Sequence, residues 1–209
     1  MPKPRFFLSS TCYDLNDARA NLTTFLEEFG FEVLNSQRPS FGVTPKVHSA
    51  QACIEQVELA DYFILIIGSR RGSEFPGATQ SITNMEFNRA KQLGLVIIPF
   101  VKDDLLTARR VHRRNPEGDF TEIVDDKRIF EFIDSIDLSQ EDNWLHSFRD
   151  VGEIIEKLKS QFSHYLLLYA KYLGRLPGKS FKPTRITMSI NGVPADIQVL
   201  ATEPEFLDR

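Results

Sequence analysis

Apolar runs suited to β-strands alternate with helical patterns along the first half of the chain. The runs, each about four to seven residues long, lie at 5–10, 31–36, 62–68 and 95–101. The segments between them, in which apolar residues recur every three or four positions as on a helix face, lie at 13–30, 49–61 and 81–94. This alternation predicts a flavodoxin-like α/β fold, in which a doubly wound parallel sheet is covered by helices on both faces.

The pattern after residue 102 is less regular. Residues 103–115 have the composition of a helix, whereas residues 127–136 fit a strand or a helix equally well. Residues 151–173 are the longest predicted helix. Its inward apolar stripe is expected to contain Val151, Ile154, Ile155, Leu158, Phe162, Tyr165, Leu166 and Tyr169.

A hairpin pattern follows that helix. Glycine and proline mark residues 174–183 as a linker. Apolar residues then alternate on both sides of Asn191-Gly192, a dipeptide that favours a tight hairpin turn. We therefore expect an α/β core at 1–102, a helical continuation of the same domain at 103–173, and a linker with a β-hairpin at 174–209 that could begin a further region.

Composition and charge narrow the function classes. The 209 residues carry a net charge of −4, so the chain as a whole has no general attraction for nucleic acids or acidic membranes. The two cysteines are too few for a disulfide framework, and with the four histidines they show no metal-ligand spacing. The N-terminus lacks the apolar core of a signal peptide, and no apolar run approaches the ~20 residues that span a membrane. We expect a soluble cytoplasmic protein without a metal site, a nucleic-acid partner or a membrane partner.

Polar side chains and glycines gather where the first and third predicted strands end. In an open parallel sheet, ligands bind at the carboxyl ends of the strands. The residues concerned are Ser9, Ser10 and Thr11 after the first strand, and Gly68, Ser69, Arg70, Arg71 and Gly72 after the third. The hydroxyl groups could bind phosphate or ribose oxygens, or could simply cap the next helix. The arginines could hold a pyrophosphate, or could lie in a solvated loop.

The helix after that glycine-rich loop places Glu86 on its inward face, with Ile82 and Ala90 four residues to either side. One interpretation is a capping box, in which Thr83 caps the helix and Glu86 completes the motif. The other is chemistry in a cleft, where a carboxylate stabilises or attacks the cation that forms when a ribosyl–base bond breaks. Spacing alone favours the capping box.

Three residues near the start of the first predicted helix could join this site. Asp14 suits the positive end of the helix dipole. Arg19 is not ideally spaced to pair with Asp14 along the helix, so it could reach elsewhere. Tyr13 could stack on a base, although packing in the core is the commoner role of such a residue.

Three sequence blocks resemble a known family. They are "FFLSSTCYDLNDAR" (6–19), "ELADYFILIIGSRRGS" (58–73) and "SITNMEFNRAKQLGLVIIPFVK" (81–102). In order and spacing, these blocks are similar to those of a TIR-like family of unknown function that is often found at the N-terminus of bacterial STAND-type ATPases. That family resembles TIR domains and nucleoside deoxyribosyltransferases in fold.

The resemblance implies a function and a site. The function is hydrolysis of the N-glycosidic bond of NAD or a related nucleotide, as an effector in bacterial antiphage immunity, with NAD as substrate and no cofactor. Glu86 takes the place of the catalytic glutamate. The pocket residues that the resemblance implies are Ser9, Ser10, Asp14, Arg19, Gly68, Arg70, Gly72 and Thr83, to which the sequence itself adds Tyr13 and Arg71.

The resemblance also implies self-association, either as a homo-oligomer or through a larger STAND-type protein. Two alternatives to NAD hydrolysis stay open. One is a non-catalytic module that binds a nucleotide or a protein in signalling, and the other is base exchange between deoxynucleosides.

Overall fold

The computed structural model describes residues 2–11, 14–36, 48–138 and 144–173, and the backbone of residues 182–190 and 193–201. The chain forms two compact units, Met1–Glu156 and Lys157–Arg209. The first unit contains a β-sheet with its covering helices, and the second contains the end of the last helix and a hairpin.

A five-stranded sheet forms the centre of the first unit. Its strands are β1 (Arg5–Ser10), β2 (Glu32–Leu34), β3 (Tyr62–Ile67), β4 (Val96–Lys102) and β5 (His146–Phe148). Their order in the sheet is β2-β1-β3-β4-β5, and every neighbouring pair is parallel. This is the strand order of flavodoxin-like folds, which confirms the predicted doubly wound α/β fold.

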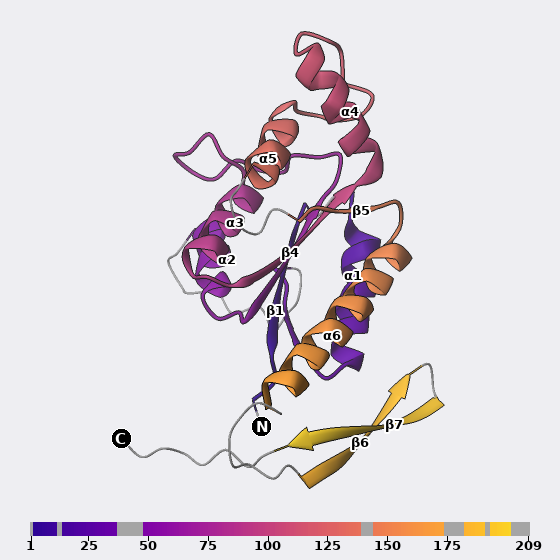
Figure 1. Cartoon of the computed structure of the whole chain (residues 1–209). Coiled ribbons are helices and arrows are strands. Elements are labelled where there is room, and N and C mark those ends of the chain that lie inside the picture. Colours follow the sequence, from indigo (N-terminus) through magenta and orange to yellow (C-terminus); the bar gives the residue numbers. More distant parts are fainter. Residues whose placement is uncertain are drawn as a thin grey trace. The chain divides into compact units, whose positions relative to one another are not determined.

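Helices cover both faces of this sheet (Figure 1). The helix α1 lies on one side, and α2 and α3 lie on the other. The helices that begin in the first unit are α1 (Asn16–Glu28), α2 (Ser49–Val57), α3 (Ile82–Gln92), α4 (Asp103–Arg114), α5 (Arg128–Asp137) and α6 (Val151–Leu173). This arrangement buries both faces of β3, which explains why its sequence is a continuous apolar run.

The region after residue 102 contains one element that the sequence left open and one that it missed. The segment that fitted a strand or a helix is α5, and its buried residues fit helical spacing: Ile129, Phe130, Phe132, Ile133 and Ile136. The missed element is β5, which pairs with the last three residues of β4 and so extends the sheet beyond residue 102. The domain boundaries proposed from the sequence remain predictions.

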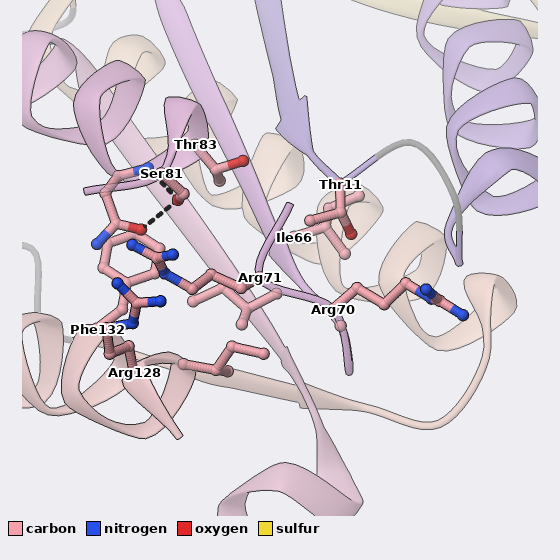
Figure 2. Close-up of a pocket in the computed structure, with 12 residues that line it drawn as sticks. Thr11, Ile66, Arg70, Arg71, Ser81, Thr83, Arg128 and Phe132 are labelled. Carbon is pink, nitrogen blue, oxygen red and sulfur yellow. Dashed lines mark hydrogen bonds between the residues drawn. The ribbon is translucent and has the colours of Figure 1, made fainter. Parts of the chain in front are cut away.

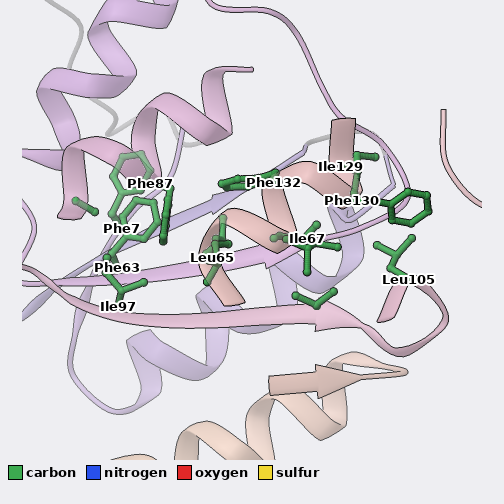
Figure 3. Close-up of a cluster of buried hydrophobic side chains, with 14 of the residues drawn as sticks. Phe7, Phe63, Leu65, Ile67, Phe87, Ile97, Leu105, Ile129, Phe130 and Phe132 are labelled. Carbon is green, nitrogen blue, oxygen red and sulfur yellow. The ribbon is translucent and has the colours of Figure 1, made fainter. Parts of the chain in front are cut away.

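The main hydrophobic core lies on the face of the sheet that carries α2 and α3 (Figure 3). Side chains alternate between the two faces along a strand, and Phe63, Leu65 and Ile67 of β3 join this cluster. The aromatic rings of Phe87 on α3 and Phe132 on α5 meet edge to face, with their centres 5.6 Å apart. These contacts hold α5 against α3 on this face of the sheet.

The apolar stripe predicted for α6 is buried only along part of the helix. Ile154, Leu158 and Phe162 are buried, whereas Leu166 and Tyr169 are more than half exposed. The prediction of an inward stripe is therefore wrong at the C-terminal end of this helix.

The second unit also contains the predicted hairpin. Its strands β6 (Lys182–Ile190) and β7 (Val193–Ala201) pair in antiparallel fashion, with Ile190 opposite Val193. This register agrees with a two-residue turn at Asn191-Gly192, although these two residues and most of the predicted linker lie outside the described residues.

Candidate functional site

The candidate site lies at the carboxyl ends of β1 and β3, where the strand order reverses. Because side chains alternate along β1, Ser9 and Ser10 point to opposite faces of the sheet. Each of them meets a buried charged residue of the helix on its own side. Ser9 contacts Glu86 of α3, and Ser10 contacts Arg19 of α1.

Glu86 is a buried carboxyl group. Only 6% of the residue is exposed, and the Ser9 hydroxyl donates a hydrogen bond to its Oε2 at 2.5 Å. Burial raises the pKa of Glu86 from 4.5 to about 7, against the opposing effects of the Ser9 hydrogen bond, the positive charge of Arg19 and a hydrogen bond with the Cys53 side chain. Near neutral pH, comparable fractions of the protein therefore carry the protonated and the charged carboxyl group.

The N-cap of α3 is Ser81. Its Oγ accepts a hydrogen bond from the backbone N–H of Asn84 at 3.2 Å and donates to Asn84 Oδ1 at 2.6 Å. The interpretation of Thr83 and Glu86 as a capping box is therefore wrong. Glu86 faces β1, and its carboxyl group is held by a strand rather than by the start of its own helix.

Arg19 is a buried cation that ties α1 to the ends of β1 and β2. Only 2% of the residue is exposed. Its guanidinium donates to Ser10 Oγ at 2.8 Å and to the backbone carbonyls of Leu8 and Ser10, each at 3.3 Å. It also donates to the side-chain oxygen of Asn35, directly after β2. Arg19 thus reaches across to the sheet and fixes the strand end that carries Ser9.

Asp14 holds the start of the β3–α3 loop against the segment after β1. One of its oxygens accepts a hydrogen bond from the Thr11 hydroxyl at 2.5 Å, and the other accepts from the backbone N–H of Ser69 at 3.0 Å. A Cβ atom on Gly68 would lie only 2.3 Å from Asp14 Oδ2. The close approach of Asp14 to the loop therefore requires glycine at position 68.

Arg71 belongs to a group of ion pairs within the β3–α3 loop and the segment before α5. Its guanidinium lies 2.9 Å from Glu74 and 3.6 Å from Asp126, and it donates to the backbone carbonyl of Thr79. Arg128 pairs with the same two carboxylates, at 3.0 Å and 2.6 Å. Hydrogen bonds from Arg71 and Arg128 lower the pKa of Glu74, and hydrogen bonds from Arg128 lower the pKa of Asp126. The positive charge of Arg71 already holds the loop through these ion pairs. The position of Arg71 therefore does not support a role in pyrophosphate binding.

Arg70 differs from Arg71 in its surroundings. It is exposed, and its side chain points away from Arg71 and Arg128 (Figure 2). Of the two arginines that the sequence offered for a pyrophosphate, Arg70 is therefore the better placed to meet a ligand from solvent.

A small pocket lies between the β3–α3 loop and α5. Its lining includes Thr11, Gly68, Arg70, Thr83, Asn84 and Phe132 (Figure 2). Its volume is about 20 Å³, which is room for about one water molecule. Pockets for larger ligands measure some hundreds of Å³, so this pocket must widen before a nucleotide can enter. Ser9 and Glu86 are not part of the lining that the described residues form.

The predicted site residues lie in several neighbouring groups. Ser9 with Glu86 and Ser10 with Arg19 form two buried pairs, one on each face of the sheet. Gly68, Arg70, Arg71, Gly72 and Thr83 lie along the pocket or in the loop beside it, and Asp14 contacts that loop through the backbone N–H of Ser69. Tyr13 lies outside the described residues.

Two residues of this site were not predicted from the sequence. Asn35 accepts a hydrogen bond from the Arg19 guanidinium, and a hydrogen bond with the Cys53 side chain of α2 lowers the pKa of Glu86. In the sequence, Cys53 stands four residues before Val57, which is the spacing of one helix face, and that was the available signal. Nothing in the local pattern at Asn35 distinguishes it from an ordinary residue at the end of a strand.

In the described residues, neither a metal-binding cluster nor a helix that could span a membrane is found. Within that part of the chain, no group of three or more histidine, cysteine, aspartate or glutamate residues is arranged to hold a metal ion. No helix described there is long and apolar enough to cross a membrane.

The fold and the two buried charged residues, Glu86 and Arg19, define a flavodoxin-like α/β domain that has a carboxylate at the point where the strand order reverses. Residues 5–163 match the family described as "Domain of unknown function (DUF4062)", and the chain belongs to that family. This agrees with the family of unknown function that the three sequence blocks resemble. No curated protein matches the chain.

One similar solved structure is that of the TIR domains in the activated Roq1 resistosome, which directly recognises the pathogen effector XopQ. The sequence identity is 15% and the TM-score is 0.47, and the match covers 77% of this chain and 99% of that chain.

Proposed function

We propose that the protein cleaves the N-glycosidic bond of NAD or a related nucleotide, with Glu86 as the residue that acts on the ribose. The observation that carries this proposal is the buried Glu86 carboxyl group, which β1 holds through Ser9 at the edge where parallel sheets bind ligands. The family has no assigned function, so the proposal stands on this geometry and on the resemblance of the sequence blocks.

The chemistry of the bond suits such a carboxylate. When a ribosyl–base bond breaks, positive charge develops at the anomeric carbon and the ring oxygen. A charged Glu86 stabilises that cation, or binds the ribose hydroxyls, and its burial strengthens the electrostatic effect because little water competes. Only the ionised form can do this, so we expect activity to rise as the pH passes through about 7.

Other residues of the site fit parts of a nucleotide. Arg70 can approach a pyrophosphate from the loop, and the hydroxyl groups of Thr11 and Thr83 line the pocket beside it. Ser9 and Ser10 already hydrogen-bond Glu86 and Arg19. For these two serines, we propose the holding of charged groups as the main role, and direct contact with ribose or phosphate as a secondary one.

A non-catalytic nucleotide-binding or protein-interaction module is the second candidate. The observation that favours it is the pocket of about 20 Å³, which the group of ion pairs around Arg71 closes on one side. An enzyme of this kind has to open the β3–α3 loop, whereas an interaction module can use the closed loop as a surface.

The deciding experiment follows nicotinamide release from NAD by the purified protein, alone and as a forced oligomer, since self-association is expected to be needed for activity. We expect the wild type to release nicotinamide and Glu86→Gln to be inactive while it still folds. Glu122→Gln, which removes an exposed carboxylate from a loop, is the matched control and should stay active.

Three results would redirect the proposal. Nucleotide binding without product, in the free protein and the oligomer alike, would favour the non-catalytic module. A product that carries a new base on deoxyribose would favour base exchange. Undiminished cleavage by Glu86→Gln would exclude the assigned role of this residue. If cleavage is found, depletion of NAD in a bacterial host would connect it to the proposed effector role in antiphage immunity.

A further inference from the structure

Four charged side chains form a ring that joins the β3–α3 loop to the start of α5. Arg71 and Glu74 belong to the loop, whereas Asp126 and Arg128 belong to the segment that leads into α5. Both arginines contact Glu74 Oε1, at 2.9 Å and 3.0 Å, and both contact Asp126 Oδ2, at 3.6 Å and 2.6 Å. Opposite charges therefore alternate around the ring. Two of its four ion pairs cross from the loop to α5: Glu74 with Arg128, and Arg71 with Asp126.

The same two arginines, Arg71 and Arg128, line the small pocket (Figure 2). A ring that holds these side chains in place also keeps the pocket at about 20 Å³, which is too small for a nucleotide. We propose that the ring is a latch, which holds the β3–α3 loop closed over the pocket and must release before a nucleotide can enter.

The latch concerns access to the candidate site, so this inference rests on the proposed function. Two of its members, Asp126 and Arg128, lie outside the three sequence blocks, which end at residue 102. The description of the family assigns no function to any residue.

The loop keeps its shape through its own backbone, independently of the ring. Phe75 donates its backbone N–H to the carbonyl of Gln80 at 2.8 Å, and Ile82 donates to Ser73 at 3.0 Å. A β-bridge also joins Glu74 to Ser81. Breaking the ring should therefore free the loop from α5 without unfolding the loop itself.

The latch is weak enough to open. The side chains of Glu74 and Arg128 are 55% and 45% exposed, and ion pairs at such exposed positions contribute little to stability. Glu74 nevertheless bridges two positive charges that contact the same oxygen. Without its carboxylate, Arg71 and Arg128 repel each other, which favours the open loop. We expect the open fraction to rise about two- to fivefold when this charge is removed.

The experiment measures access to the pocket with a thiol placed in its wall. Ser81 lines the pocket and is only 1% exposed, so Ser81→Cys is a buried reporter of nearly the same size. Its reaction with N-ethylmaleimide, an uncharged reagent, is followed in the whole chain by mass spectrometry of the peptide that contains residue 81. If the loss of the Ser81 cap prevents folding, Thr11→Cys replaces it, since Thr11 belongs to the same lining and is 7% exposed.

In chains that carry the reporter, Glu74→Gln and Arg128→Gln should each speed the reaction about two- to fivefold. Glu122→Gln removes an exposed carboxylate outside the ring, so it is the matched control and should leave the rate unchanged. Equal rates in all these chains would overturn the proposal. A matching gain at the native Cys53 of α2, recorded in the same digest, would also overturn it, because the whole chain would then be looser.

The labelling needs neither a nucleotide nor turnover. If the wild type cleaves no NAD, the proposed function fails while the labelling still decides whether the latch controls the pocket. If it does cleave NAD, Glu74→Gln without the reporter should lower KM by the factor found in the labelling and leave kcat unchanged, because a larger fraction of the protein is competent to bind. Faster labelling with an unchanged KM would overturn the proposal, because the substrate would then enter by another route.

Discussion

Replacing Glu86 with glutamine should stabilise the folded protein at pH 8. Glutamine has almost the same shape and can still hydrogen-bond Ser9, but it brings no charge into the buried site. In the wild type, the proton on Glu86 is held more tightly in the folded chain than in the unfolded chain, because burial disfavours the charged form.

The magnitude follows from the two pKa values. The carboxyl group titrates at about 7 in the folded protein, against an ordinary value of 4.5. At 1.36 kcal/mol for each pKa unit, this difference corresponds to about 3 kcal/mol. The sign follows from the raised pKa: the stabilisation from the bound proton is fully present below pH 4.5 and is lost as the pH rises through about 7. Glu86→Gln should therefore match the wild type near pH 4.5 and exceed its free energy of unfolding by about 3 kcal/mol at pH 8.

Urea unfolding at several pH values between 4.5 and 8 measures this difference. Other carboxylates, such as Glu74 and Asp126 with their lowered pKa values, are common to both proteins and cancel in the comparison. Glu122→Gln controls for the loss of one negative charge from the surface. If the curves of the wild type and Glu86→Gln run parallel over this range, Glu86 is not buried with a raised pKa, and the reasoning about its chemistry fails with it.

Two further variants test how the site is held together. Arg19→Leu should lower the free energy of unfolding by about 3 kcal/mol or more, since the acceptors on Ser10 and Asn35 lose their buried donor; urea unfolding measures this, and a loss below about 1 kcal/mol would contradict it. Gly68→Ala should destabilise by about 1–3 kcal/mol and speed hydrogen exchange in the β3–α3 loop, because the added Cβ displaces Asp14. Unchanged exchange and an unchanged melting temperature would show that the approach of Asp14 is not a constraint.

Most of the fold could be predicted from periodicity alone. The four strands in the first half of the chain are short apolar runs between helical patterns, and such runs reveal a buried parallel sheet. The fifth strand could not be found in this way, because its three residues, His-Ser-Phe, form no run. The secondary structure of residues 127–136 could not be predicted, because closely spaced apolar residues fit a buried strand as well as one helix face. Contacts with the sheet decide between strand and helix.

The site was predictable only in part. The carboxyl ends of β1 and β3 locate it, and alternation along β1 already separates Ser9 from Ser10. The partner of Ser9 is 77 positions away, and no local pattern specifies a contact at that separation. The cap of α3 was mispredicted because two possible capping motifs, Ser-x-x-Asn and Thr-x-x-Glu, begin only two residues apart. The β-bridge between Glu74 and Ser81 fixes where the chain enters the helix and so selects the first motif.

The shortness of β5 has a consequence for how the protein behaves when shortened. The strand β4 is apolar. On its outer edge, β5 pairs only with the last three residues of β4, from Phe100 onward. Unpaired strand edges act as templates on which other chains add strands and aggregate. A chain that ends before His146 leaves the whole outer edge of β4 open and is expected to aggregate, so its inactivity would not show that the chemistry is missing. Activity assays on shortened chains therefore need to retain β5, however few residues it contains.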